Sequence, residues 1–188
     1  HAQKQSGWKD LIAFDQLELN NFFKKGKKID SNNPTYYKDT VCLGSKGKIQ
    51  ARAMNDLIKE VNLPIGHVFS SPICRARETA QYVFNGYEKL DEGFTYVDIT
   101  SAKPADRGDQ IRELYQSLPI KKGTNTIISA HNGVLSHYVF DNLSNSLDTD
   151  LLFTEEGSFY VISQIDNKLY LEHNFEKLSN FSKYALSD

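Results

Sequence analysis

The chain has 188 residues, the length of one domain with a single core, and its 39% hydrophobic residues exclude wholesale disorder. Its 22 basic and 24 acidic residues give a net charge of −2, which excludes a global field that draws the protein to nucleic acid or an anionic membrane. No apolar run approaches the roughly 18 residues that span a bilayer, so no membrane span is expected. We therefore expect one domain over residues 1–188, with residues 1–30 structurally unassigned.

Helical and β-rich segments alternate along the chain, which is typical of an α/β sheet with covering helices. In chain order the pattern indicates a strand at 10–14, a helix at 17–25, a loop at 30–39, a helix at 47–61, a strand at 67–70, helices at 76–84 and 107–118, a strand at 126–130, a helix at 133–143, and a hairpin of 158–165 with 169–173. The central sheet is expected to be mostly parallel.

Residues 70–80, SSPICRARETA, lie where the strand expected at 67–70 passes into a helix. A helix N-terminus offers backbone N–H groups and the positive end of the helix dipole, and Arg75 and Arg77 add guanidinium donors. This combination indicates an anion site. The alternative is that both arginines are solvated helix residues near Glu78.

Residues 129–133, SAHNG, carry the second candidate group, because His131 and Asn132 directly follow a buried strand. In open α/β sheets the ligand crevice lies at the carboxyl ends of the strands. A lone histidine at such a position can equally be a capping residue. Since Arg75 and His131 are expected at neighbouring strand ends, we predict that they share a phosphate pocket, with Asn132 as a further substrate-binding residue.

The segment SSPICRARETA resembles the SSPxxRAxxTA motif of the histidine phosphatase (phosphoglycerate mutase-like) superfamily, and NTIISAHNG at 125–133 resembles the second-histidine strand of that family. LGSKGKIQA at 43–51 resembles the start of its first covering helix, and residues 155–157 with the final hairpin resemble its C-terminal strands. The small phosphohistidine-phosphatase-like branch is the most similar, with Asp39 and Cys42 matching an acidic residue and a cysteine before that helix. The resemblance implies a three-layer α/β/α sandwich.

The resemblance also implies a phosphatase mechanism. The histidine of an Arg-His pair at the end of the first strand attacks phosphorus, and water then hydrolyses the phosphohistidine. Arg75 matches the later arginine and His131 the second histidine, so both are expected to bind phosphoryl oxygens. We expect no cofactor and no metal ion, and a small phosphorylated molecule or a phosphoprotein as the partner.

The sequence departs from the family at the Arg-His pair, which it lacks; the only histidine before His67 is His1. In one register, residues 10–14 are the first strand and Asp15 and Gln16 take the place of the pair, where an aspartate repels phosphate and a glutamine cannot attack phosphorus. This register predicts a degenerate, inactive phosphate-binding domain.

In the second register, residues 17–28 form the helix that precedes the first strand, and a strand of ~10 residues is absent between Lys28 and Asn32. The protein is then an active phosphatase whose Arg-His segment lies outside this sequence.

A general acid within residues 88–92 and an anion site at Lys24–Lys28 are weaker candidates, because charge runs are usually solvated faces. His67 is expected to be structural.

The resemblance places Cys42 in the loop before the first covering helix and Cys74 inside the phosphate-loop motif. These two segments are expected to pack together, so we expect a disulfide between the two cysteines. A disulfide favours an oxidising compartment, and we therefore expect an exported protein, periplasmic or secreted rather than cytoplasmic.

Overall fold

The computed structural model of the chain describes residues 2–4, 15, 18–19, 41–96, 104–143 and 155–186. The strand expected at 10–14 and the loop expected at 30–39 lie outside the described residues. Of the helix expected at 17–25, Glu18 and Leu19 are described, and both are helical, as is Asp15. No helix in the described part of the chain has the length and apolar character to cross a membrane.

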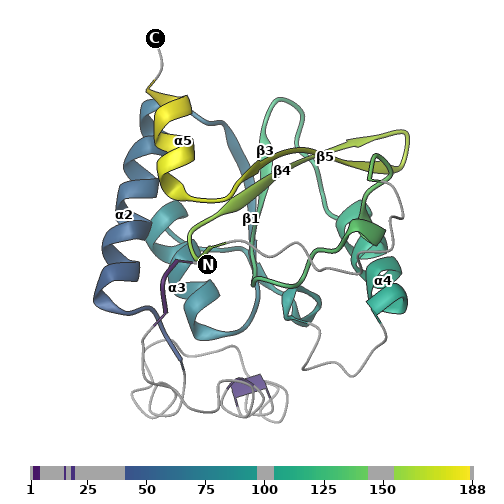
Figure 1. The fold of residues 1–188 in the computed structure, drawn as a ribbon, viewed down its shortest axis with the longest axis horizontal. Helices are drawn as coiled ribbons and strands as arrows, with labels where there is room; N and C mark the ends of the chain where they lie inside the picture. Colours follow the sequence, from purple (N-terminus) through teal and green to yellow (C-terminus); the bar gives the residue numbers. More distant parts are fainter. Residues whose placement is uncertain are drawn as a thin grey trace.

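A parallel sheet of three short strands stands at the centre of the described fold (Figure 1). Strand β1 (Ile65–Ser70) pairs with β2 (Lys89–Leu90) on one side and with β3 (Asn125–Ser129) on the other. Ser70 stands opposite Ser129 at the carboxyl ends of β1 and β3. The loops that follow these two strands therefore leave the sheet at the same edge, where open α/β sheets bind ligands.

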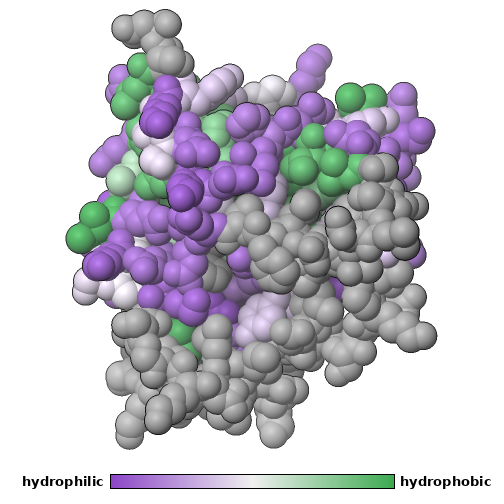
Figure 2. Space-filling model, viewed as in Figure 1, coloured by the Kyte–Doolittle hydropathy of each residue, from purple (hydrophilic) through white to green (hydrophobic). Residues whose placement is uncertain are grey.

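Helices cover the sheet on two sides, which confirms the expected three-layer α/β architecture. One side carries α2 (Ser45–Glu60), α3 (Cys74–Phe84) and the short α5 (Leu178–Ala185), and the other carries α4 (Pro104–Gln116), as Figure 1 shows. The strands and helices expected at 47–61, 67–70, 76–84, 107–118 and 126–130 are thus confirmed, with ends shifted by a few residues. On the face of the molecule seen in Figure 2, hydrophilic residues cover most of the described surface.

Two clusters of buried hydrophobic side chains hold the layers together, one on each face of the sheet. The first packs α4 against β1 and the segment after β3, and its members include Phe69, Phe94, Ile111, Tyr115 and Val139. The second packs α2, α3 and α5 together, and its members include Leu43, Ala51, Ile58, Val83 and Phe181. Burial of this apolar surface is the main force that fixes the helices on the sheet.

The expected terminal hairpin is present as β4 (Phe159–Ile165) and β5 (Lys168–Phe175), which pair antiparallel. Its two turn residues, Asp166 and Asn167, have φ angles of 50° and 60°, the left-handed conformation that two-residue hairpin turns require. Among the described residues the hairpin forms a sheet of its own beside the parallel one.

The prediction of a helix at 133–143 is wrong. Only a three-residue 3₁₀ turn, η3 (His137–Val139), forms there. Gly133 has a φ of 80°, which no α-helix accommodates, and Arg112 of α4 donates a hydrogen bond to the carbonyl of Tyr138. The apolar residues of this segment, such as the completely buried Val139, therefore pack into the core under α4 without forming a helix.

Residues 2–4 pack against the start of α2 and the middle of α3. The carbonyl of Gln3 accepts a hydrogen bond from the backbone of Gly44 at 3.1 Å, and the backbone N–H of Ala2 donates to Thr79 Oγ1 of α3 at 2.9 Å. Ala2 is buried. This approach needs Gly47, because a Cβ at that position would lie 1.9 Å from the carbonyl oxygen of Gln3.

We expect Gly47→Ala to destabilise the protein by about 1–3 kcal/mol, although alanine favours a helix interior, because the added methyl group displaces residues 2–4. Urea denaturation measures the loss. Lys46→Ala, an exposed substitution in the same helical turn, is the matched control and should change the unfolding free energy by less than about 0.5 kcal/mol. A Gly47→Ala protein as stable as wild type would contradict the close approach.

Candidate functional site

The loops that follow β1 and β3 are hydrogen-bonded to each other at the carboxyl edge of the sheet. The backbone N–H of Ser71 donates to the carbonyl of Ser129 at 2.9 Å, and the Ser71 hydroxyl lies 2.8 Å from Nε2 of His131. The same hydroxyl oxygen accepts a bond from the backbone of Ile73. The two predicted motifs are therefore in contact, and Ser71 joins them.

Tyr96 stands between Arg75 and His131. Its ring meets the His131 ring edge to face, with centroids 5.6 Å apart, and the Arg75 guanidinium carbon lies 5.8 Å from the Tyr96 centroid. The structure thus brings the two predicted residues to a shared aromatic neighbour. Asn132 is exposed beside His131. Tyr96 belongs to no motif, and the sequence carries no periodicity that singles it out.

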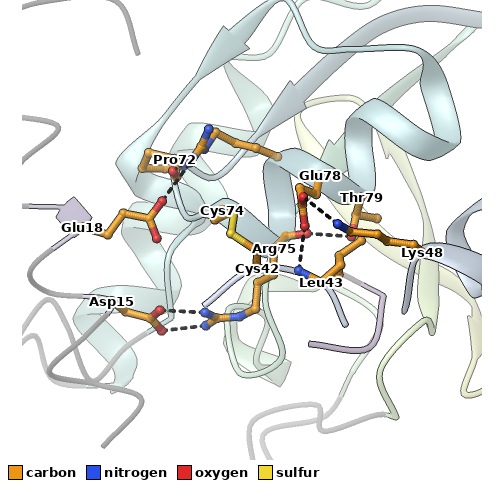
Figure 3. Close-up of a disulfide and its surroundings, with 11 residues drawn as sticks. Asp15, Glu18, Cys42, Leu43, Lys48, Pro72, Cys74, Arg75, Glu78 and Thr79 are labelled. Atoms are coloured by element: carbon orange, nitrogen blue, oxygen red, sulfur yellow. Dashed lines mark hydrogen bonds and ion pairs between the residues drawn. A yellow bond between two sulfur atoms is a disulfide. The ribbon is translucent and has the colours of Figure 1, made fainter. Parts of the chain in front are cut away.

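Arg75 is buried in a bidentate ion pair with Asp15 (Figure 3). Its two terminal nitrogens donate to the two carboxylate oxygens at 2.6 and 2.7 Å, and the Tyr96 hydroxyl donates to Asp15 Oδ2 at 2.5 Å. Burial alone would lower the pKa of Arg75, but the bonds and charge of Asp15 raise it. Arg75 is therefore a fixed positive charge with an anion in its fork.

Arg77 forms a second buried ion pair, with Glu18 at 2.9 Å, and its Nε donates to the carbonyl of Pro72. The alternative of two solvated arginines near Glu78 is therefore wrong, because Arg75 and Arg77 are 1% and 3% exposed. Glu78 accepts a bond from the backbone of Leu43 instead. Both ion pairs join residues some 60 positions apart in the chain, so no local sequence pattern indicates them.

His131 is held as a neutral imidazole. Its pKa lies well below the ordinary value of 6.5 because the ring is buried and because the positive charges of Arg75 and Lys4 act on it. Lys4 itself pairs with Glu156 at 2.5 Å. Burial and these neighbouring positive charges therefore both favour the neutral form of the ring.

This shift predicts that folding stability depends on pH. The unfolded chain binds a proton on His131 below about pH 6.5 and the folded protein does not, so stability falls as pH decreases through that value. At pH 5.5 the cost is about 1.4 kcal/mol. In His131→Asn, the loss of unfolding free energy between pH 7.5 and pH 5.5 should be smaller than in wild type by this amount. Denaturant titrations at both pH values measure it, and equal losses in the two proteins would refute a neutral buried His131.

The expected disulfide is confirmed: Cys42 and Cys74 are bonded, with their Cα atoms 4.9 Å apart (Figure 3). The bond ties the loop before α2 to the first residue of α3, directly before Arg75. One carboxylate oxygen of Glu78 and the two sulfurs lie within 4.8 Å of one another, and these are atom types that can bind a metal ion. Sulfurs bonded to each other offer no thiolate, so this group is structural in the oxidised protein.

The remaining candidates lie elsewhere or outside the described residues. His67 contacts Glu88 at 2.9 Å and stacks on Phe69, as a structural histidine does. In the run 88–92, Asp91 accepts a bond from the backbone of Gly93, and Glu92 is exposed. Gln16, Lys24–Lys28 and Asp39 lie outside the described residues.

The sequence model of the histidine phosphatase superfamily (branch 1) matches residues 35–93, which include the SSPICRARETA segment. No curated protein matches the sequence significantly.

Three solved structures have similar folds. A mutant phosphoserine phosphatase from Entamoeba histolytica, in complex with phosphoserine, has a TM-score of 0.57 and 17% identity, over 78% of this chain and 87% of that one. YhfR from Bacillus stearothermophilus has a TM-score of 0.53 and 18% identity, over 77% and 89%. The product of the open reading frame Rv3214 from Mycobacterium tuberculosis has a TM-score of 0.51 and 15% identity, over 73% and 86%. These structures have the same fold as this chain, and the family model matches the part of the chain that carries the first motif.

Proposed function

We propose that the protein is a phosphatase that removes the phosphoryl group from a small phosphorylated molecule or a phosphoprotein, and that it belongs to the small phosphohistidine-phosphatase-like branch. Arg75 and His131 bind the phosphoryl oxygens, and Asn132 contacts the substrate. The observation that carries the proposal is the buried Arg75 fork, which already holds an oxyanion beside His131. The Entamoeba histolytica enzyme of similar fold, which holds phosphoserine, supports a phosphate monoester as the substrate class.

We assign the nucleophile to His1. His1 lies outside the described residues, but Ala2 donates to Thr79, whose hydroxyl in turn donates to the carbonyl of Arg75. Ala2 therefore lies against the helix that carries Arg75. The signal in the sequence is the step His1-Ala2, which has the histidine and the small residue of an Arg-His-Ala motif.

The reaction then proceeds in two displacements. The His1 imidazole attacks phosphorus, the bond to the leaving oxygen breaks, and a phosphohistidine forms. Water attacks the same phosphorus, releases inorganic phosphate and restores the imidazole. Arg75 neutralises charge on the phosphoryl oxygens in both steps, and the neutral His131 donates a hydrogen bond to them.

A second candidate function is a degenerate phosphate-binding domain without turnover. The position of Asp15 favours it, because a carboxylate in the fork of Arg75 opposes a phosphoryl group there. We also propose that the protein acts in an oxidising compartment, periplasmic or extracellular, because the Cys42–Cys74 bond persists under such conditions.

Hydrolysis of p-nitrophenyl phosphate and of a phosphohistidine peptide, together with phosphate binding by calorimetry, tests the two functions. The phosphatase proposal expects turnover that Arg75→Lys strongly reduces, because lysine keeps the charge and loses the fork. Arg77→Lys, equally buried and two residues away in α3, is the matched control and should retain turnover. Phosphate binding without turnover would establish the degenerate domain, and absence of both would refute the site.

A further inference from the structure

We propose that Asp15 is an internal occupant of a phosphoryl seat formed by Arg75 and Tyr96, and that a phosphoryl group binds by displacing this carboxylate. The inference rests on the proposed phosphate site. It adds Tyr96 as a binding residue and Asp15 as a regulator of affinity.

The contacts of Asp15 have the form of a bound ligand's contacts. Two guanidinium nitrogens and one phenol hydroxyl donate to its carboxylate, at 2.6, 2.7 and 2.5 Å. All three are charge-assisted hydrogen bonds, and the planar fork of arginine fits carboxylate and phosphate oxygens equally well. A phosphoryl group in the same place can accept every bond that Asp15 now accepts.

The burial of the seat explains why it is filled in the absence of substrate. Arg75 is 1% exposed and Asp15 is completely buried. A buried guanidinium without a counter-ion is strongly unfavourable. In the absence of phosphate, pairing of Arg75 with the carboxylate of Asp15 is therefore favoured. A phosphate dianion carries twice the charge of that carboxylate and can replace it.

The neighbouring ion pair of Arg77 is held differently from the Arg75 pair. Arg77 divides its donors between Glu18 and the carbonyl of Pro72, so it is anchored to the backbone of its own loop. Arg75 turns both terminal nitrogens to Asp15, and its guanidinium lies against the Tyr96 ring beside His131. Of the two buried pairs in the described part of the chain, the Arg75 pair is the one next to His131, the second predicted phosphate-binding residue.

When Asp15 occupies the seat, phosphate can bind only the fraction of molecules in which the seat is open. The apparent affinity is the intrinsic affinity multiplied by that fraction. If Asp15 fills the seat in about nine of ten molecules, removing its charge tightens binding about tenfold. Asp15→Asn keeps the shape of the side chain and one hydrogen-bond acceptor while it removes the competing charge. We therefore expect the Kd for inorganic phosphate to fall about tenfold in Asp15→Asn.

The experiment is isothermal titration calorimetry of the full chain with inorganic phosphate, with the thermal shift caused by phosphate as the second readout. Asp15→Asn should bind about tenfold more tightly and gain more thermal stability from phosphate than wild type. Glu18→Gln is the matched control, because it removes an equally buried carboxylate one helical turn away and should leave the Kd unchanged within about twofold. Adding Tyr96→Phe to Asp15→Asn should weaken binding about tenfold through loss of one bond to a charged group.

Equal phosphate affinities in wild type and Asp15→Asn would overturn the inference and leave the phosphate site intact. Tighter binding in Glu18→Gln as well would also overturn it, since a general loss of negative charge would then be the cause. If neither wild type nor Asp15→Asn binds phosphate, the proposed function fails and this inference fails with it. If Asp15→Asn is poorly folded without phosphate, the thermal shift alone decides, and an absent shift counts against the occupant.

Discussion

His1→Asn is expected to lower kcat for phosphate ester hydrolysis by at least about a thousandfold, because asparagine cannot form a covalent bond to phosphorus. Phosphate binding should persist, since the seat is built by Arg75 and its neighbours. Rapid quench of the wild-type reaction followed by mass spectrometry of the N-terminal peptide should find the phosphate adduct on His1, and the variant should lack it.

His67→Asn is the control for this experiment, because His67 pairs with Glu88 away from the phosphate site. It should retain wild-type turnover within about twofold. A His1→Asn protein with unchanged turnover would remove His1 from the mechanism. An adduct on any residue other than His1 would reassign the nucleophile.

Loss of the disulfide is expected to cost the protein about 3–4 kcal/mol of unfolding free energy. The bond closes a loop with a sequence separation of 32, and this magnitude follows from the entropy that such a loop removes from the unfolded chain. The double variant Cys42→Ser/Cys74→Ser, compared with wild type by urea denaturation, measures the loss.

Reduced wild-type protein provides the matched comparison, because it has the same sequence with free thiols. Reduction should lower stability to near that of the double serine variant. A change below about 1 kcal/mol in both samples would show that the two segments are held together mainly by their packing.

The parts of the site that follow from sequence are those with local patterns. SSPICRARETA and SAHNG each span a strand end and the residues after it, so the sheet topology alone brings Arg75 and His131 to one edge. Helix α2 shows its apolar face every three to four residues. The short α5 has too few residues for such a pattern, and its place depends on Phe181 packing against Phe159 and Phe175.

The parts that sequence did not predict depend on contacts across long stretches of chain. The register that put Asp15 in the place of the Arg-His pair predicted a carboxylate harmful to phosphate binding. It gave no means of seeing that this carboxylate lies in the fork of Arg75, 60 residues away. Tyr96 carries no motif. The segment 133–143 has helical spacing, but backbone geometry at Gly133 decides its conformation.

The two buried ion pairs also fix how one stretch of chain docks on another. Asp15 and Glu18 are three residues apart in helical conformation, and their partners Arg75 and Arg77 are two residues apart in α3. A slide of the docked residues along α3, or a reversal of their direction, would mismatch both pairs and leave buried charges unpaired. When phosphate takes the place of Asp15, the Glu18–Arg77 pair remains. That pair still holds Glu18 against α3 while Asp15 is displaced.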